Sequence, residues 1–555
     1  MTTDSAASKK PGCWIPEDLN PQNFQSVIDV FLHSCKEFKS LPAYTCMGKT
    51  ITYEELDTLS SAFAAYLQNK TDLQVGDRIA IQLPNVIQSP VAVFGAMKAG
   101  LIVVNTNPLY TPKELLHQFN DSGAKALVVF ANMAHNVEKI IDQTDIKHVF
   151  VTEIADFHPV PKKWLINSVV KYVKKLVPPF SLPKSISFFS AVQDGKQLKA
   201  NIIAKKPEEI AVLQYTGGTT GVAKGAMLTH ANLISNMHQL GDRLSEHCIL
   251  GEELYIAPLP LYHIYSFLIH GLTLVSRGAH TILIPNPRDI PGFVKELKNW
   301  KFSGFVGLNT LFVALCNNEE FKKLDFSRLK VTASGGMALT HSAADEWKRI
   351  TGRTVIEGYG LTETSPVVSF NPVGKEKIGT IGLPVDHTLL KLLGENNQPV
   401  AEGEAGVLCV SGPQVMKGYW QREEATKEDM TDDGYFITGD IAKIHSDGYV
   451  QIVDRAKDMI NVSGFNVYPT EIEDCLSSHQ GILEAAAVGV PDDKTGEAVK
   501  AFVVLKNDLK DIDVEAVREF CREELAAYKV PKYVEVRVEL PKTNVGKVLR
   551  RALRE

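Results

Sequence analysis

A segment rich in glycine and threonine, Tyr215–Gly225, is well suited to hold a phosphate group. Its sequence is YTGGTTGVAKG, and it follows an apolar strand pattern at Ile210–Leu213. Glycines let consecutive backbone N–H groups converge on phosphate oxygens, while threonine hydroxyls and Lys224 add donors and positive charge. The spacing of Gly221 and Lys224 differs from that of a Walker A loop. A plain turn is the alternative, but six consecutive glycine or hydroxyl residues favour phosphate binding.

Two further motifs carry residues that suit other parts of a nucleotide. GYGLTE at 358–363 places Tyr359, which can stack on a base, near Glu363, which can bind a hard cation such as Mg²⁺ through oxygen. TGD at 438–440 offers Asp440, whose two oxygens suit the ribose hydroxyls. Taken alone, Glu363 is better explained as a solvated glutamate and Asp440 as a turn cap. The two motifs indicate nucleotide binding only when they are considered together with the phosphate loop.

His263 and Lys547 are candidates for catalysis, but each also has a purely structural explanation. His263 lies between Tyr262 and Ile264, and a histidine with apolar neighbours is more often part of a core. Lys547 lies in a glycine-bearing stretch, PKTNVGK, within a tail that has eight basic and three acidic residues from Lys529 onward. That tail could simply be solvated, but a lysine that reaches a reacting phosphate group would stabilise the charge that develops in the transition state.

The first 360 residues alternate strand and helix patterns, which predicts parallel, doubly wound sheets. The expected strands are 78–83, 101–104, 126–130, 280–284, 304–306, 330–333 and 354–356. The expected helices are 89–99, 111–120, 289–298, 309–316 and 340–350. Ligands of such sheets bind at the carboxyl ends of the strands, near a topological switch point.

The alternation of strand and helix patterns ends after Lys375. Short strands such as 407–411 and 449–453 are separated by turn residues, which predicts an antiparallel, barrel-like subdomain over about 375–453. A final block contains expected helices at 469–478 and 514–525 and strands at 484–490, 499–505 and 533–538. We therefore expect an α/β protein with a large N-terminal domain, 1–455, of two doubly wound sheets plus the barrel-like subdomain, and a small α+β C-terminal domain, 456–555.

Composition excludes some classes of function. The 555 residues include 59 basic and 65 acidic residues, a balance that argues against nucleic-acid binding. The eight cysteines form no CxxC pair, which is typical of reduced thiols in a cytoplasmic protein, and the first residues show no signal peptide. The uncharged stretch Leu254–Ser276 contains two prolines and two histidines, so we expect a buried segment rather than a membrane span.

The phosphate loop resembles that of the adenylate-forming superfamily, which includes acyl-CoA synthetases. Five further motifs of that superfamily occur in the same order along the chain. They are LYH at 261–263, GYGLTE at 358–363, TGD at 438–440, DRAKDMINVSG at 454–464 and PKTNVGK at 541–547. Several independent motifs in order are far more specific than any one, and the resemblance covers nearly the whole chain.

The resemblance implies roles for individual residues. It implies ATP and AMP binding by Thr216, Gly217, Gly218, Thr219, Thr220, Gly221, Lys224, Gly225, Gly336, Glu357, Tyr359, Asp440 and Arg455. It implies catalysis by Lys547, His263 and Thr362, and binding of Mg²⁺ by Glu363 and Thr216. It also implies coenzyme A binding by Ser463, Gly464 and Phe465. Lys457 would be a hinge that makes the C-terminal domain mobile and serves two half-reactions in turn, adenylation of an acid and transfer to coenzyme A.

Four segments and a signature stretch at 433–457 look like bacterial long-chain fatty acyl-CoA synthetases. The segments are 105–114, 286–291, 309–312 and 463–469. The stretch departs at Ala456, where related enzymes often carry a lysine, and we expect little effect from that. The resemblance thus implies a fatty acid, ATP and coenzyme A as partners, no nucleic acid, and leaves a homodimer open.

A segment at 164–177 has apolar residues on one helical arc and lysines on the other. Such a helix suits either the surface of an anionic membrane or the protein's own core, and the sequence favours neither. With the first reading, the protein would be cytoplasmic and peripherally attached to the inner face of the cytoplasmic membrane.

Three alternatives remain within the superfamily. A luciferase-like oxidoreductase is disfavoured because the chain ends in RALRE rather than in a peroxisomal signal. A fatty acyl-AMP ligase serving a carrier protein would carry an insertion in the large domain, and none is evident. A relative that only binds ligands is disfavoured by the complete motif set, which includes Glu363 and Lys547.

Overall fold

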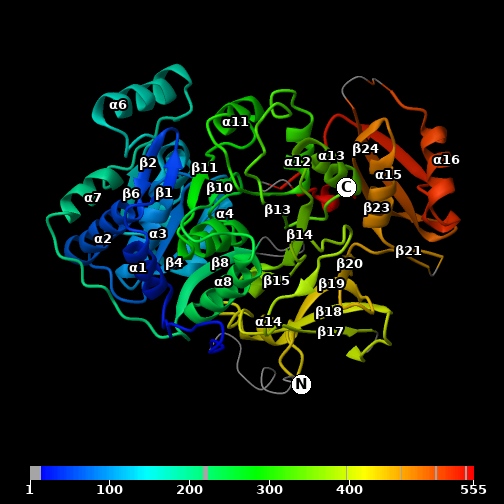
Figure 1. Cartoon of the computed structure of the whole chain (residues 1–555), viewed down its shortest axis with the longest axis horizontal. Helices are drawn as coiled ribbons and strands as arrows, with labels where there is room; N and C mark the ends of the chain where they lie inside the picture. The colour runs from blue at the N-terminus through cyan, green and yellow to red at the C-terminus, as the bar shows by residue number, and fades with distance from the viewer. Residues whose placement is uncertain are drawn as a thin grey trace.

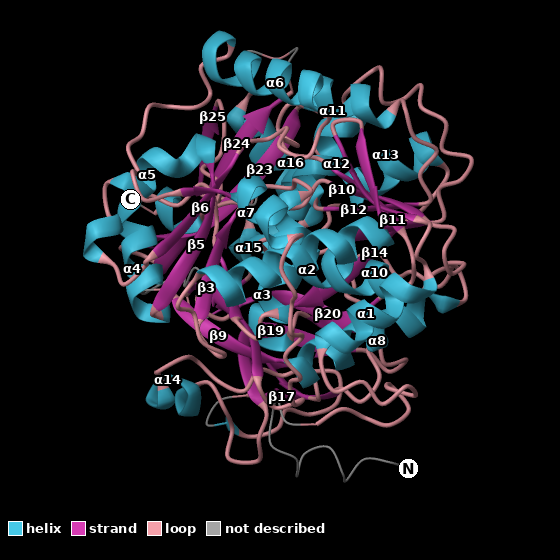
Figure 2. Cartoon of the chain, turned by 90° about the vertical axis from the view of Figure 1, so that its left-hand side faces the viewer, coloured by secondary structure: helices cyan, strands magenta, loops and turns pink. Residues whose placement is uncertain are grey.

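The computed structural model describes residues 14–216, 223–394, 397–463, 465–506, 509, 511–543 and 547–554. The large domain is built on two mixed sheets that enclose a layer of helices, as Figure 2 shows. The helices between the sheets include α1 (Val27–Glu37), α2 (Tyr53–Lys70), α3 (Gln88–Lys98) and α8 (His230–Ser245). Because α3 is buried along its whole length, it packs on neighbours all round.

The first sheet has seven strands in the order β7-β6-β5-β3-β4-β8-β9. Their bounds are β3 (Arg78–Gln82), β4 (Ile102–Asn105), β5 (Ala124–Phe130), β6 (His148–Thr152), β7 (Ile186–Ser187), β8 (Ile210–Thr216) and β9 (Lys224–Thr229). All neighbours are parallel except β8 and β9, which form a hairpin. Its outer face is covered by α4 (Pro112–Ser122) and α5 (Ala134–Glu138), and α7 (Phe188–Gly195) packs on α2.

The second sheet has nine strands in the order β16-β15-β14-β13-β12-β10-β11-β1-β2. Their bounds are β1 (Pro42–Cys46), β2 (Lys49–Thr52), β10 (Leu254–Ala257), β11 (His280–Leu283), β12 (Gly304–Gly307), β13 (Val331–Ser334), β14 (Val355–Gly360), β15 (Val367–Phe370) and β16 (Leu383–Pro384). Its central strands are parallel. Further helices of this half are α11 (Ile290–Leu297), α12 (Asn309–Cys316) and α13 (His341–Thr351).

The expected alternation of strand and helix is confirmed, and local signals account for the boundaries. Helix α4 begins with a capping box, in which Thr111 and Glu114 satisfy each other's backbone N–H groups, and Pro112 occupies the first turn. It ends at Gly123, whose φ of 61° is left-handed, a conformation that glycine adopts at low cost. Helix α12 has the bounds that the sequence predicts.

The region after Lys375 forms an antiparallel sheet, as expected. It has four strands: β17 (Leu389–Leu393), β18 (Ala405–Ser411), β19 (Phe436–Ile444) and β20 (Val450–Arg455). Helix α14 (Glu423–Glu428) lies between β18 and β19 in the chain. This four-stranded sheet lies at the bottom of the view in Figure 1. Val450 of β20 also forms an isolated β-bridge with Gly382.

The C-terminal residues form the separate α+β unit at the right of Figure 1. Its sheet runs β22-β21-β24-β23, with β25 paired to β24. The elements are β21 (Ile460–Val462), β22 (Phe465–Val467), α15 (Pro469–Ser478), β23 (Ile482–Asp492), β24 (Gly496–Leu505), α16 (Val514–Glu524) and β25 (Tyr533–Arg537). Apolar residues of α15 and α16 pack on one face of the sheet, and Leu540 and Leu553 pack on the other.

The uncharged stretch 254–276 is buried in the large domain, as predicted. It forms β10, two short helices and a π-helix, η4 (Phe267–Thr273), whose residues are all buried. Within the described parts of the chain, no helix has the length and apolar character needed to cross a membrane.

The segment at 164–177 forms α6 (Val160–Ser168) and a π-helix, η3 (Val169–Val173), which project at the upper left of Figure 1. The side toward the body is partly polar. Asn167 is buried, accepts a hydrogen bond from the Ala155 N–H at 3.0 Å and donates one to Glu153 Oε2 at 2.9 Å. Large apolar side chains are instead exposed, including Trp164 at 77% and Val173 at 74%.

Candidate active site

The nucleotide-binding residues predicted from the sequence meet where the nine-stranded sheet adjoins the antiparallel sheet. Tyr359, in β14, donates a hydrogen bond of 2.5 Å to Asp440 Oδ2 in β19. Arg455, at the end of β20, lies with its Nε 3.3 Å from the other oxygen of Asp440. Burial raises the pKa of Asp440, and Arg455 and Tyr359 oppose that rise. Two side chains therefore orient one carboxylate, as recognition of a ribose requires.

The phosphate loop connects β8 to β9. Thr216 and Lys224 are paired across the base of this hairpin, as are Tyr215 and Gly225. The predicted loop residues Gly217, Gly218, Thr219, Thr220 and Gly221 lie outside the described residues. At the loop's exit, Lys224 Nζ lies 3.4 Å from Asp429 Oδ2 and 4.4 Å from the centre of the Tyr419 ring.

Glu363 lies in a short 3-10 helix, η5 (Thr362–Thr364), together with Thr362. Its Oε1 accepts a hydrogen bond of 2.9 Å from Tyr419. Burial raises the pKa of this carboxyl group, and within the described residues no lysine or arginine lies within ion-pair distance of it. A partly buried carboxylate that makes no direct ion pair with a lysine or arginine suits a bound cation.

Mg²⁺ fits this donor chemistry. Within the described residues there is no group of three or more His, Cys, Asp or Glu side chains placed to hold a metal. Mg²⁺ at nucleotide sites commonly uses one or two protein carboxylates and takes its remaining ligands from phosphates and water. Glu363 can supply the carboxylate, and the Thr216 hydroxyl at the loop entrance is a neutral oxygen ligand.

His263 lies at the start of a short helix, α9 (Ile264–Ser266), where its Nδ1 accepts a hydrogen bond of 3.3 Å from the Tyr265 N–H. Burial, together with the positive charge of Lys547, lowers the pKa of His263 to about 3. The imidazole is therefore neutral at physiological pH, and it can donate from Nε2 when Nδ1 accepts.

Lys547 is brought to this same region from the C-terminal domain. Its backbone N–H donates to Thr543 Oγ1 at 3.0 Å, and its side chain extends toward Gly336. Burial and the charge of Arg455 lower the pKa of Lys547 to about 8, while Asp440 and Glu363 oppose that change. The ammonium group thus lies in the electrostatic field of Arg455, Asp440 and Glu363, three side chains predicted to bind ATP or Mg²⁺.

Gly336 and Glu357 line the same end of the sheet. Gly336 has a φ of 83°, and a β-carbon on it would lie 3.8 Å from Lys547 Cε. Glu357, in β14, accepts from the Leu339 N–H at 3.1 Å through Oε1, whereas its buried Oε2 has no partner among the described residues. Burial raises the pKa of Glu357 to about 8, so it is available as a hydrogen-bond donor near neutral pH.

The residues predicted for coenzyme A and the hinge lie at the start of the C-terminal domain. Lys457 is exposed between β20 and β21. Ser463 has a φ of 54°, and Phe465 is 55% exposed and stacks on Tyr528 with ring centres 4.7 Å apart. Gly464 lies outside the described residues.

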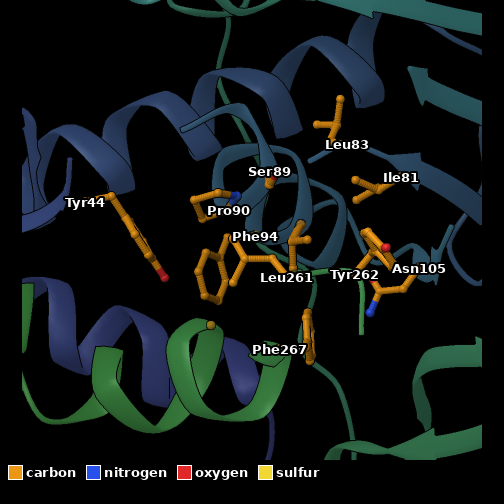
Figure 3. A pocket seen from close by; sticks show the side chains of 12 residues that line it. Tyr44, Ile81, Leu83, Ser89, Pro90, Phe94, Asn105, Leu261, Tyr262 and Phe267 are labelled. Carbon is orange, nitrogen blue, oxygen red and sulfur yellow. The ribbon is translucent and has the colours of Figure 1, made fainter. Parts of the chain in front are cut away.

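An apolar pocket is lined in part by Leu261 and Tyr262, the two residues before His263. Figure 3 shows Tyr262 and Asn105 at one side, Phe94 and Pro90 of α3 at another, and Phe267 of η4 below. A second, smaller pocket shares Phe94 and Gly271 with the first and is otherwise lined by residues of α1, α8 and η4–α10. The two pockets are therefore adjacent, with Phe94 and Gly271 at their boundary.

Tyr419 is a site residue that the sequence analysis missed. It contacts both Glu363 and Lys224, and it is separated from Glu363 by 56 residues. It belongs to no motif recognised in the sequence. Locally, only its place directly after Gly418 marks it.

The chain matches sequence profiles of two families. The AMP-binding enzyme family matches residues 31–420, and the AMP-binding enzyme C-terminal domain matches residues 471–547. A long-chain-fatty-acid–CoA ligase from Salmonella typhimurium strain LT2 is 51% identical over 545 residues, covering 98% of this chain and 96% of its own. A long-chain-fatty-acid–CoA ligase from Bacillus subtilis strain 168 is 37% identical, with the same coverage.

Solved structures agree with these matches. ATP-bound MatB from Rhodopseudomonas palustris has a TM-score of 0.81 and 28% identity, over 95% of this chain and 98% of its own. An anthranilate CoA ligase, AuaEII, in complex with anthranoyl-AMP, has a TM-score of 0.85 at 23% identity, and it supports the fold. The resemblance noted in the sequence is thereby confirmed, and the chain belongs to the AMP-binding enzyme family.

Proposed function

We propose that this chain is an AMP-forming long-chain fatty acid–CoA ligase. It converts a fatty acid, ATP and coenzyme A into acyl-CoA, AMP and pyrophosphate. The observation that carries this proposal is the placement of Lys547 beside Gly336, within the field of Asp440 and Glu363. Relatives named long-chain-fatty-acid–CoA ligase, about half identical over nearly the whole chain, support the choice of acid and thiol.

In the first half-reaction, a fatty-acid carboxylate oxygen attacks the α-phosphorus of ATP and pyrophosphate leaves. Lys547 stabilises the negative charge shared by the carboxylate and the α-phosphate. Tyr359, Asp440 and Arg455 hold the nucleoside, Thr362 lies beside the α-phosphate, and the loop at 216–225 holds the phosphates. Glu363 and Thr216 would hold Mg²⁺, which neutralises phosphate charge.

In the second half-reaction, the thiol of coenzyme A loses its proton and attacks the acyl carbonyl carbon, and AMP leaves. The C-terminal domain turns about Lys457 between the two steps, which withdraws Lys547 and brings in the face at Ser463–Phe465. The exposed ring pair of Phe465 and Tyr528 supports this role, because a partner can reach it. Neutral His263 stands beside the acyl carbonyl.

The apolar cavity beside Tyr262 receives the hydrocarbon tail. Its walls come from apolar side chains of β3, α3 and η4, so a tail that enters it leaves water without burying a charge. Tyr44 lines this cavity, and its hydroxyl donates a hydrogen bond of 2.8 Å to the His270 carbonyl. Because the hydroxyl is satisfied in this way, the side chain presents its apolar ring to the cavity.

The exposed side of α6 and η3 lies on the surface of an anionic membrane, from which the insoluble acid is taken. Exposed lysines accompany the exposed apolar side chains, namely Lys162, Lys171, Lys174 and Lys175. The exposure of Trp164, Leu165, Tyr172 and Val173 favours the membrane reading over packing on the core, which would have buried them.

The test is AMP formation with a series of acids from acetate to oleate, with and without coenzyme A. We expect CoA-dependent AMP release that increases with chain length into the long-chain range. Pyrophosphate release with acid but no CoA-dependent AMP release would instead indicate an acyl-AMP ligase that serves another acceptor.

A further inference from the structure

An ion-pair cluster at the domain boundary contains side chains that the proposed mechanism does not use. Arg550, three residues beyond Lys547, makes a bidentate contact with Glu473 of α15, through Nε at 2.9 Å and Nη2 at 2.7 Å. Its Nη1 lies 3.2 Å from Asp458 and 3.4 Å from Asp454. One guanidinium group therefore joins three carboxylates.

These carboxylates lie on opposite sides of the hinge. Asp454 belongs to β20 of the large domain and precedes Lys457, whereas Asp458 follows Lys457 and Glu473 belongs to the C-terminal domain. Rotation about Lys457 moves Arg550, Asp458 and Glu473 together, because all three are part of the rotating body. Asp454 stays behind.

Asp454 depends on the C-terminal domain for its polar contacts. Its side chain is 1% exposed. One oxygen receives Arg550 and the neighbouring Arg455 N–H, and the other accepts from the Thr470 N–H at 2.8 Å. Thr470 also belongs to the C-terminal domain, so rotation removes two of the three donors. A buried carboxylate that loses donors is destabilised until water replaces them.

We propose that Arg550 and Thr470, bound to Asp454, form a clasp that holds Lys547 in the adenylation position and must open for transfer to coenzyme A. Arg550 is then a positioning residue, since it acts through the placement of Lys547. This inference rests on the rotation about Lys457 in the proposed function. The strength of the clasp sets how the enzyme divides its time between the two half-reactions.

The test compares the half-reactions separately in the full-length protein. Adenylation is followed by fatty-acid-dependent ATP–pyrophosphate exchange, and transfer by the reaction of preformed acyl-AMP with coenzyme A. Asp454→Asn removes the charge but keeps an oxygen for the Thr470 N–H. We expect it to shift the ratio of adenylation to transfer roughly tenfold toward transfer, the size of one hydrogen bond to a charged group. Arg550→Lys should shift it in the same direction.

Arg554→Ala is the matched control. Arg554 contacts Asp458 at 3.0 Å, within the rotating body, so the ratio should stay as in the unmodified protein. A damaged fold would slow both half-reactions together and lower the melting temperature, whereas an opened clasp moves the ratio at an unchanged melting temperature. An unchanged ratio in Asp454→Asn and Arg550→Lys overturns the clasp. If the clasp is overturned in this way but Lys547→Ala slows adenylation and not transfer, the proposed rotation about Lys457 is still supported.

Discussion

Lys547 of the C-terminal domain points at Gly336 of the large domain, close enough that a β-carbon on the glycine would stand 3.8 Å from Lys547 Cε. The backbone of Lys547 is anchored by Thr543, and its segment is flanked by Leu540 and Leu553, which both pack on the domain's sheet. The ammonium group therefore reaches the predicted nucleotide site from an anchored backbone, and its charge state should control adenylation.

Adenylation is expected to depend on the pKa of Lys547, which burial and the nearby Arg455 lower to about 8. The ammonium charge is present below that pH and is lost above it. Hence kcat/KM for adenylation should fall as pH rises through about 8, while transfer from preformed acyl-AMP should lack this limb. In Lys547→Arg the falling limb should move beyond the range measured. A shared limb in both half-reactions would assign it to another group.

Lys547→Ala should distinguish adenylation from transfer to coenzyme A more clearly than the pH dependence does. Loss of the ammonium should lower ATP–pyrophosphate exchange by roughly a hundredfold or more, in the range found when one charge-stabilising donor is removed. Preformed acyl-AMP should still react with coenzyme A at close to the original rate. An equal loss in both steps would contradict a division of labour between two domain positions.

Glu363→Gln should raise the Mg²⁺ concentration needed for half-maximal pyrophosphate exchange by roughly tenfold or more, because a neutral amide is a poor ligand for a hard cation. Tyr419→Phe removes the hydrogen bond to Glu363 but keeps the carboxylate, so its effect should be in the same direction and smaller. Asp433→Asn is the control, since that exposed carboxylate pairs with Lys391. Equal Mg²⁺ dependence in all three variants would exclude Glu363 as the ligand.

Gly271→Leu should shift the preference of the enzyme toward fatty acids with shorter chains. Gly271 and Phe94 line both apolar pockets, so a leucine at position 271 would fill space that a long tail needs. Gly271→Ala is the control, because a β-carbon at this position would make only ordinary contact with Phe267, at 3.8 Å. kcat/KM should fall for oleate and stay within about twofold for octanoate. A uniform loss for all acids would mean that the tail lies elsewhere.

Trp164→Ala combined with Lys171→Glu and Lys174→Glu should release the protein from anionic vesicles. Each lysine near such a surface contributes about 1 kcal/mol, so two charge reversals and the lost indole should weaken binding more than a hundredfold. Sedimentation with vesicles measures this. Lys301→Glu with Lys323→Glu, on another exposed surface, should bind as before. Unchanged binding of the triple variant would exclude this helix as the contact.

The sequence was most informative where structure is decided by neighbours in the chain. The bounds of α12 and α15 are those predicted, since a proline start or apolar spacing is local. Contacts such as Tyr419 to Glu363 and Arg550 to Asp454 join residues 56 and 96 positions apart, so no motif could pair them. The exposure of Trp164 also depended on tertiary structure, because one arc of apolar residues suits a core and a membrane equally.

The polar anchoring of α6 has a consequence for how a membrane would be bound. Asn167 fixes the helix to Glu153 and to the Ala155 backbone before any lipid is met. Many amphipathic segments fold only on the bilayer, and they lose conformational entropy as they bind. In the proposed membrane binding, a helix that is already folded avoids that loss, so the circular dichroism spectrum of the protein should stay unchanged when anionic vesicles are added.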